Sequence, residues 1–238
     1  MQRARRDIQP AVDFLTTRAK KPDADDWGKL RRFLRYLNGT LNMELTLAVD
    51  NMSIVNWFVG SPYMTHMDCK VHVGGAITLG KGAVISISAK IKSNTKSSTE
   101  TEIYGENHVL NTALWRNYLL EAQGYKIKHN IIHQDNQSCM RLKINGSLSS
   151  SGRTKHIKAR YYYITDNIED GDIEVKYFPI DEMWVDMLTK PKQGTLFLKN
   201  RALLQNVPIN YDDEVECKRT HPGLLPCHDT HKKGNLAN

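Results

Sequence analysis

The chain has 238 residues, with 33 Lys or Arg against 26 Asp or Glu and a formal net charge of +7. This length suits one main domain with extensions and would crowd two full domains. No apolar run approaches the roughly 20 residues that cross a bilayer, and the first residues, MQRARRDIQPAV, lack the apolar stretch of a signal peptide. We therefore expect an intracellular protein, cytoplasmic or nuclear, without a membrane partner.

The four cysteines are far apart, which in such a chain argues against a disulfide framework and for reduced thiols. Two of them, Cys217 and Cys227, lie among the histidines of the C-terminal tail. The spacing of these residues matches neither a zinc knuckle nor a two-cysteine, two-histidine finger, so we expect no zinc site there.

Basic residues are concentrated beside the acidic segments of the chain. A solvated surface would explain any single run, but this placement and the net charge favour nucleic acid as the partner. Contacts of Lys and Arg with phosphates would be independent of base sequence and strongly dependent on salt. The candidates for such contacts are Lys96, Arg153, Lys155, His156 and Arg160, although His156 is equally well explained as a plain surface histidine.

The first part of the chain predicts two helices followed by strands. Apolar residues recur at three- and four-residue steps between Asp7 and Asn38, and Gly39 is a natural helix end. From Met43 to Ala89, short runs of Val, Ile, Trp and Phe are separated by glycines. This pattern predicts three strands in antiparallel succession.

A single long helix is predicted for SSTETEIYGENHVLNTALWRNYLLEAQG. Ser97 followed by Glu100 is a capping-box pattern, and Gly124 would end the helix. Glu102 falls in the first turn, and Glu106 lies one turn later on the same face. The acidic end of this face is a candidate for contact with a metal ion.

Two further carboxylates occur at the ends or starts of predicted elements. KIKHNIIHQD predicts a strand that ends at Asp135, with Asn136 as the cap of a short helix. After a serine-rich loop we expect a helix over HIKARYYYITDNIEDG and a strand over DIEVKYF, and Pro179 and Asp181 would start a helix that carries Asp186. Ligand sites in α/β sheets favour strand ends such as that of Asp135.

Glu102, Asp135 and Asp186 together suit a site that holds hard divalent cations through oxygen ligands. Sites of this kind support in-line attack of water on a phosphodiester. Taken singly, each residue would be interpreted as a solvated carboxylate or a helix cap. Their places at a helix start, a strand end and a late helix favour a shared site.

Four sequence blocks resemble the C-terminal part of copia-type LTR retrotransposon polyproteins, namely the end of the reverse transcriptase followed by its ribonuclease H (RNase H) domain. In chain order they are TKSSTETE, QDNQSC, RTKHIKARYYYI and VDMLTKP. The resemblance implies a helical remnant of the reverse-transcriptase thumb and connection over residues 1–45 and an RNase H-like domain over 46–190. A C-terminal helix over 191–207 and a polar tail over 208–238, expected to be disordered, would follow.

The resemblance implies both a fold and a reaction. The fold is α/β and RNase H-like, a mixed five-stranded sheet flanked by helices with a small helical N-terminal extension. The reaction is hydrolysis of the RNA strand of an RNA–DNA hybrid with two magnesium ions, for which Glu102, Asp135 and Asp186 would be catalytic residues and metal ligands. RNA–DNA hybrid or other nucleic acid, and other parts of the polyprotein, are the implied partners.

The first catalytic position departs from the family pattern. An aspartate is expected after the Trp-Phe-Val run of residues 57–59, but Gly60 stands there and offers no side-chain oxygen. Asp68 is the alternative donor, disfavoured because relatives often carry a separate acid in that stretch. We therefore expect weak or absent nuclease activity, and the alternative is an inactive nucleic-acid-binding remnant. Because Met1 falls within the reverse-transcriptase part, no polymerase activity is expected.

Overall fold

The structure is a computed structural model that describes residues 4–63, 66, 70–145 and 158–209. Its centre is a five-stranded sheet with the strand order β5-β3-β2-β6-β7. Strand β3 is antiparallel to β2 and β5, whereas β2, β6 and β7 are parallel. The strands are β2 (Ile54–Gly60), β3 (Lys70–Thr78), β5 (Ile85–Asn94), β6 (His129–Gln134) and β7 (Glu174–Tyr177).

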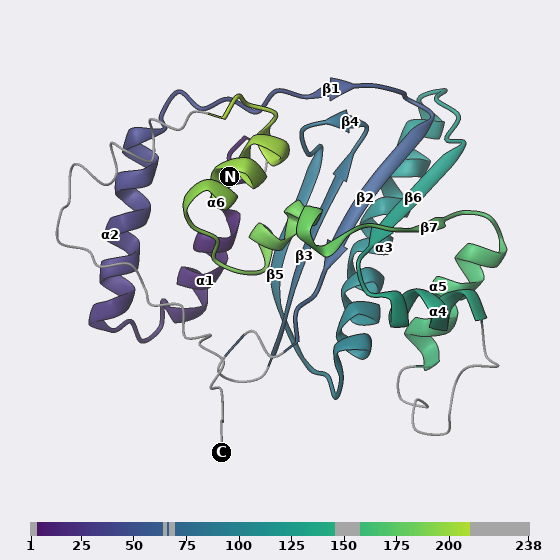
Figure 1. Cartoon of the computed structure of the whole chain (residues 1–238), viewed down its shortest axis with the longest axis horizontal. Helices are drawn as coiled ribbons and strands as arrows, with labels where there is room; N and C mark the ends of the chain where they lie inside the picture. Colours follow the sequence, from purple (N-terminus) through teal and green to yellow (C-terminus); the bar gives the residue numbers. More distant parts are fainter. Residues whose placement is uncertain (1–3, 64–65, 67–69, 146–157, 210–238) are drawn as a thin grey trace, which may run out of the picture.

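The remaining elements surround this sheet (Figure 1). A two-residue pair, β1 (Ala48–Val49) and β4 (Gly80–Lys81), forms a separate small sheet. The helices are α1 (Gln9–Arg18), α2 (Ala24–Gly39), α3 (Ser98–Ala122), α4 (Gln137–Asn145), α5 (Lys158–Glu169) and α6 (Gly194–Gln205), with two short 3₁₀ helices, η3 (Ile180–Glu182) and η4 (Trp184–Leu188). The predicted architecture, a mixed five-stranded α/β sheet flanked by helices with a small helical N-terminal extension, is confirmed. None of the helices in the described ranges has the length and apolar character to cross a membrane.

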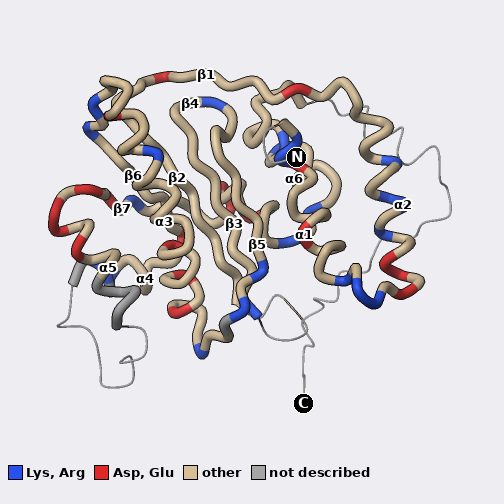
Figure 2. Tube along the Cα trace, turned by 180° about the vertical axis from the view of Figure 1, so that it is seen from behind, with Lys and Arg blue, Asp and Glu red and all other residues tan. Residues whose placement is uncertain are grey.

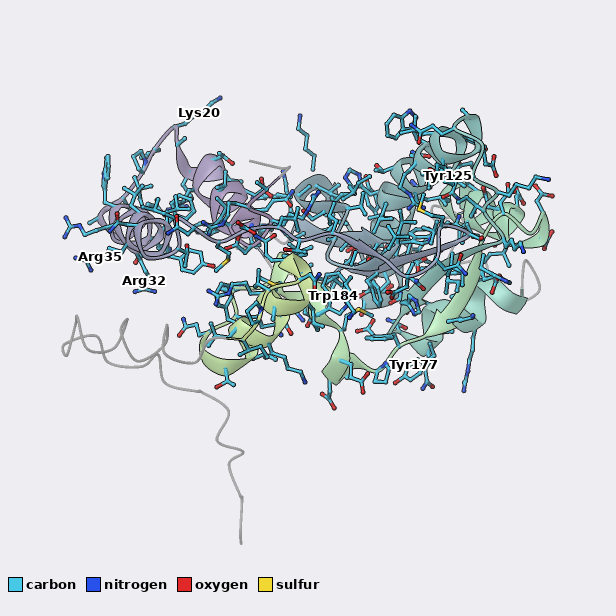
Figure 3. The ribbon with its side chains drawn as sticks, turned by 90° about the horizontal axis from the view of Figure 1, so that it is seen from above. Lys20, Arg32, Arg35, Tyr125, Tyr177 and Trp184 are labelled. Atoms are coloured by element: carbon cyan, nitrogen blue, oxygen red, sulfur yellow. The ribbon has the colours of Figure 1, made fainter. Side chains whose placement is uncertain are left out.

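The sheet is buried on both faces because apolar side chains of β2 point alternately to opposite sides. Val55, Trp57 and Val59 join the core beneath α3. Phe58 joins a second core with Trp184 and Val185 of η4. Figure 3 shows Trp184 on the side of the sheet opposite α3. The near-continuous apolar run of β2 is the pattern expected of a strand covered on both faces.

The helix starts follow their predicted caps. The backbone N–H of Glu100 donates to Ser97 Oγ over 3.1 Å at the start of α3, and Gly124 follows the helix with a φ of +92°. The backbone N–H of Cys139 donates to Asn136 Oδ1 over 3.0 Å at the start of α4. Both helices are therefore placed by local side-chain chemistry, as the sequence indicates.

Two predictions need correction or extension. The helix expected to carry Asp186 is instead the pair η3 and η4, because Met183 between them has a non-helical backbone with ψ of 83°. The N-terminal helix α1 packs against β5 and η4, so the N-terminal extension contacts the sheet directly. The domain boundaries inferred from the resemblance remain predictions.

The close approach of η4 to the sheet depends on Gly74 of β3. Gly74 is the register partner of Gly60 on β2. A Cβ atom at Gly74 would collide with Thr189 Cγ2 and lie 3.0 Å from Leu188 Cβ. A Cβ atom at Gly60 would meet nothing closer than 3.5 Å. Packing therefore requires a glycine at position 74 but not at position 60.

This contrast predicts different effects of the same substitution at the two positions. Gly74→Ala should lower the free energy of unfolding by about 1–3 kcal/mol, because overpacking forces η4 away from β3. Gly60→Ala should change it by less than about 0.5 kcal/mol. Urea unfolding of both variants measures the difference, and equal losses would contradict this account of η4 docking.

Candidate active site

The four positions singled out in the sequence meet at one edge of the sheet. Gly60 is the last residue of β2, and Asp135 directly follows β6. These strands are parallel with Phe58 opposite His133, so Gly60 is level with Asp135. Glu102 is the fifth residue of α3, just past the predicted first turn, and Asp186 lies in η4; α3 and η4 cover opposite faces of the same edge.

Glu102 is held by the residue that follows Gly60. The backbone N–H of Ser61 donates to Glu102 Oε2 over 3.2 Å. This contact is possible because Gly105, on the next turn of α3, has no Cβ atom to collide with the Ser61 side chain. Burial, and then the negative charges of Asp135 and Glu106, hold the pKa of Glu102 well above its ordinary value, while Ser61 and Gln134 act in the opposite direction.

Asp186 lies beside the vacancy at Gly60. A Cβ atom built on Gly60 would be 3.5 Å from Asp186 Oδ1, an ordinary van der Waals distance. Burial, and then the charge of Asp186, raise the pKa of Asp135, and Lys190 partly opposes this shift. Each carboxylate therefore feels the charge of a neighbour in the trio, and the open space at Gly60 adjoins Asp186.

Glu102, Asp135 and Asp186 have the carboxylate oxygens that a magnesium site needs, but they are not arranged around a common position for an ion. Carboxylate oxygens suit hard divalent cations. Within the described ranges, however, no group of three or more His, Cys, Asp or Glu is placed so that it could hold a metal ion. Gly60 adds no donor, and Asp186 is paired with Lys190 and Lys192. The residues present therefore do not fit a two-ion site, and the metal role of the trio remains a prediction.

A buried ion pair lies beneath the trio and was not predicted from the sequence. Lys143 of α4 donates to Glu106 of α3, and both side chains are fully buried. Gln134 Nε2 also donates to Glu106 Oε1 over 2.9 Å, while Gln134 Oε1 accepts from the backbone N–H of Asp135 over 2.8 Å. The pair thus anchors the corner that carries Asp135. The sequence shows Glu106 on the otherwise apolar face of α3, but nothing in it indicates that Lys143 is the partner.

The predicted nucleic-acid contacts are only partly described. Lys96 is exposed directly before α3. Figure 2 shows Lys and Arg positions at the end of β5 and before α3, next to acidic positions along the first half of α3. Arg160 lies in α5, and its side chain is not described. Arg153, Lys155 and His156, together with Asp68, Cys217 and Cys227, lie outside the described residues.

Comparison with known proteins identifies the relatives of this chain. No protein-family model matches it. It is 29% identical over 195 residues to the retrovirus-related Pol polyprotein from transposon RE2 of Arabidopsis thaliana, a match that covers 81% of this chain and 13% of the polyprotein. For the corresponding polyprotein from transposon TNT 1-94 of Nicotiana tabacum, the identity is 27% over 187 residues, covering 78% and 14%. The chain is related in sequence to the Pol polyproteins of copia-type retrotransposons. The kinship predicted from the four sequence blocks is confirmed, for a chain that spans a small part of its relatives.

Solved structures similar to this chain include LC11-RNase H1, an RNase H1 isolated from compost, and a foamy viral enzyme. The compost RNase H1 has a TM-score of 0.45 at 13% identity, covering 58% of this chain and 93% of that protein. The foamy viral protease-reverse transcriptase has a TM-score of 0.37 at 14% identity, covering 64% of this chain and 29% of that protein.

The raised pKa of Glu102 predicts a defined pH dependence of stability. In the unfolded chain Glu102 ionises near pH 4.3, whereas the folded protein retains its proton to higher pH. Unfolding therefore releases a proton, and stability falls as pH rises above the ordinary glutamate range until the folded pKa is passed. Glu102→Gln lacks this contribution, so its free energy of unfolding should rise relative to that of the native chain as pH increases above the ordinary glutamate range; urea unfolding in steps of ~0.5 pH unit measures this difference. A difference that stays constant over this rise in pH would contradict the prediction.

Breaking the Lys143–Glu106 ion pair should destabilise the protein strongly, and replacing both residues should restore most of its stability. Lys143→Met should lower the free energy of unfolding by about 3–5 kcal/mol, because Glu106 is then a buried charge without its cation. The double variant Lys143→Met with Glu106→Leu should recover most of this loss, since an apolar pair replaces the ion pair. Urea unfolding of the three variants, including Glu106→Leu alone, gives the coupling energy. Additive losses in the double variant would show that the pair does not act as a unit.

Proposed function

We propose that this chain is an RNase H-like domain of retrotransposon origin that engages RNA–DNA hybrids and hydrolyses their RNA strand weakly or not at all. The observation that carries the proposal is the convergence of Glu102, Asp135 and Asp186 around Gly60, where an additional side chain would fit but is missing. The kinship with Pol polyproteins supports the proposed substrate class, and the lack of a carboxylate at Gly60 supports the proposed impairment.

The substrate side of the proposal rests on charge. The net charge of +7 favours a polyanion, and exposed Lys96 lies at the start of the helix that carries Glu102. Arg153, Lys155, His156 and Arg160 would extend this basic surface in the same proposal. A protein that binds phosphates through such residues loses affinity steeply as salt increases. An intracellular location, cytoplasmic or nuclear, belongs to the same proposal.

The catalytic side rests on what the residues at the sheet edge can do. Ser61 orients the carboxylate of Glu102 through its backbone N–H. The Gln134 amide fixes the backbone that presents Asp135. Asp186 faces the space that a side chain at residue 60 would fill. Two magnesium ions are the cofactor that the resemblance implies, and the lack of a carboxylate at Gly60 is the reason for expecting little turnover.

The alternative function is a nucleic-acid-binding module without catalysis. It is favoured by the pairing of Asp186 with two lysines, since a carboxylate already neutralised by ammonium groups has less attraction for metal ions. The two functions share the same fold and differ in whether a carboxylate at residue 60 is enough to give hydrolysis.

Gly60→Asp tests the proposal directly. The substitution should raise the rate of cleavage of a labelled RNA–DNA hybrid in magnesium by about a hundredfold or more, because a missing carboxylate costs several kcal/mol in the transition state. Gly60→Asn is the matched control, with the same size and no charge, and it should leave the rate unchanged. Gel analysis of the labelled RNA strand measures the rate.

Three outcomes separate the alternatives. Native cleavage as fast as that of Gly60→Asp would refute the impairment. Cleavage by neither protein, with the fold intact and hybrid still bound in a salt-dependent manner, would favour the binding module. Loss of hybrid binding in both proteins would refute the proposed substrate class.

A further inference from the structure

The Asp186 carboxylate forms ion pairs with two lysines that follow it in the sequence. Lys190 Nζ and Lys192 Nζ each lie 3.4 Å from Asp186 Oδ2. The local backbone holds them there, because the backbone N–H of Lys190 donates to the carbonyl oxygen of Asp186 over 3.0 Å. Pro191 between the two lysines has a fixed φ, which restricts the second lysine. The side chain of Asp186 is 14% exposed, so this oxygen is near the surface but not freely solvated.

The charge of Lys190 reaches Asp135 as well as Asp186, because Lys190 lowers the pKa of Asp135 and contacts Asp186. The trio carries three negative charges when ionised, and the two lysines offset two of them. A Cβ atom at Gly60 would meet the other oxygen of Asp186, Oδ1, rather than the one held by the lysines.

We propose that Lys190 and Lys192 act as built-in counter-ions of this site, so that a divalent cation binds Asp186 only by displacing an ammonium group. The two kinds of cation compete because both need Asp186 Oδ2. The inference deepens the proposed function and rests on it only for the choice of the trio. It explains how the negative charges of Asp135 and Asp186 remain close together without a metal ion.

The competition should be measurable without unfolding the protein. Lys190 is 44% and Lys192 22% exposed, and ion pairs of this kind contribute little to stability. Their effect on a divalent ion is larger, because each is a unit charge of the same sign within a few ångströms of it. Coulomb's law at the dielectric constant of water gives a repulsion equivalent to about tenfold in affinity for each lysine.

The test is a titration of the full chain with Mn²⁺ alone at constant ionic strength, followed by calorimetry or by the electron paramagnetic resonance signal of free Mn²⁺. Lys190→Met with Lys192→Met should bind Mn²⁺ about a hundredfold more tightly than the native chain, which is about tenfold for each lysine. Lys190→Met alone should give a smaller gain. Methionine keeps the length of the side chain and removes only its charge, and circular dichroism verifies that each variant is folded.

Two controls assign the effect to Asp186. Lys199→Met removes an exposed lysine of α6 that is not a partner of Asp186, and it should leave the affinity at the native value. Adding Asp186→Asn to the double lysine variant should abolish the gain. Equal Mn²⁺ affinity in the native and double lysine variants would overturn the proposal, as would an equal gain in Lys199→Met. Because the readout is binding, failure of Gly60→Asp to cut RNA would not affect it.

Discussion

Repulsion among carboxylates brought to one edge of a sheet is the interaction to which the rest of this site is fitted. Glu102, Asp135 and Asp186 come from a helix, a strand end and a short 3₁₀ helix, and the parallel pairing of β2 with β6 fixes their common edge. Burial strengthens the repulsion, since charges interact more strongly where water is excluded. The fold must therefore supply either protons, hydrogen-bond donors or positive charges at this edge.

Protons, hydrogen-bond donors and positive charges all compensate the carboxylates in this structure. Glu102 retains a proton to raised pH and accepts from the Ser61 backbone. Glu106, one turn further into the core, is matched by the buried ammonium of Lys143. Asp186, nearer the surface, is matched by Lys190 and Lys192. The fully buried Glu106 therefore has a dedicated buried cation, whereas Asp186 has two partly exposed ones. A buried charge without a partner costs far more than an exposed one.

Much of this architecture could be predicted because its determinants are local. Ser97 and Asn136 cap their helices through their own side chains, and these caps place Glu102 and Asp135. Asp186 lies near Gly60, but in a short 3₁₀ helix rather than the predicted helix, because the non-helical backbone of Met183 interrupts the segment. The Lys143–Glu106 pair joins residues 37 positions apart, and no pattern along the chain links them. Lys190 and Lys192 were visible as charges beside Asp186, but their shared oxygen is a matter of geometry.

The lack of a carboxylate at Gly60 and the two lysines beside Asp186 both reduce the negative charge at this edge of the sheet. Lower negative charge favours stability without a metal ion and weakens the attraction for one. Gly60 is not required by packing, unlike its register partner Gly74, so packing does not account for the lack of a carboxylate there. A fourth carboxylate would add repulsion to Asp186 unless a cation arrived with it. Without that carboxylate, two ammonium groups are enough to leave a nearly neutral edge. A site that needs no metal to be stable has correspondingly little attraction for one, which is the cost in function that stable, charge-compensated active sites commonly carry.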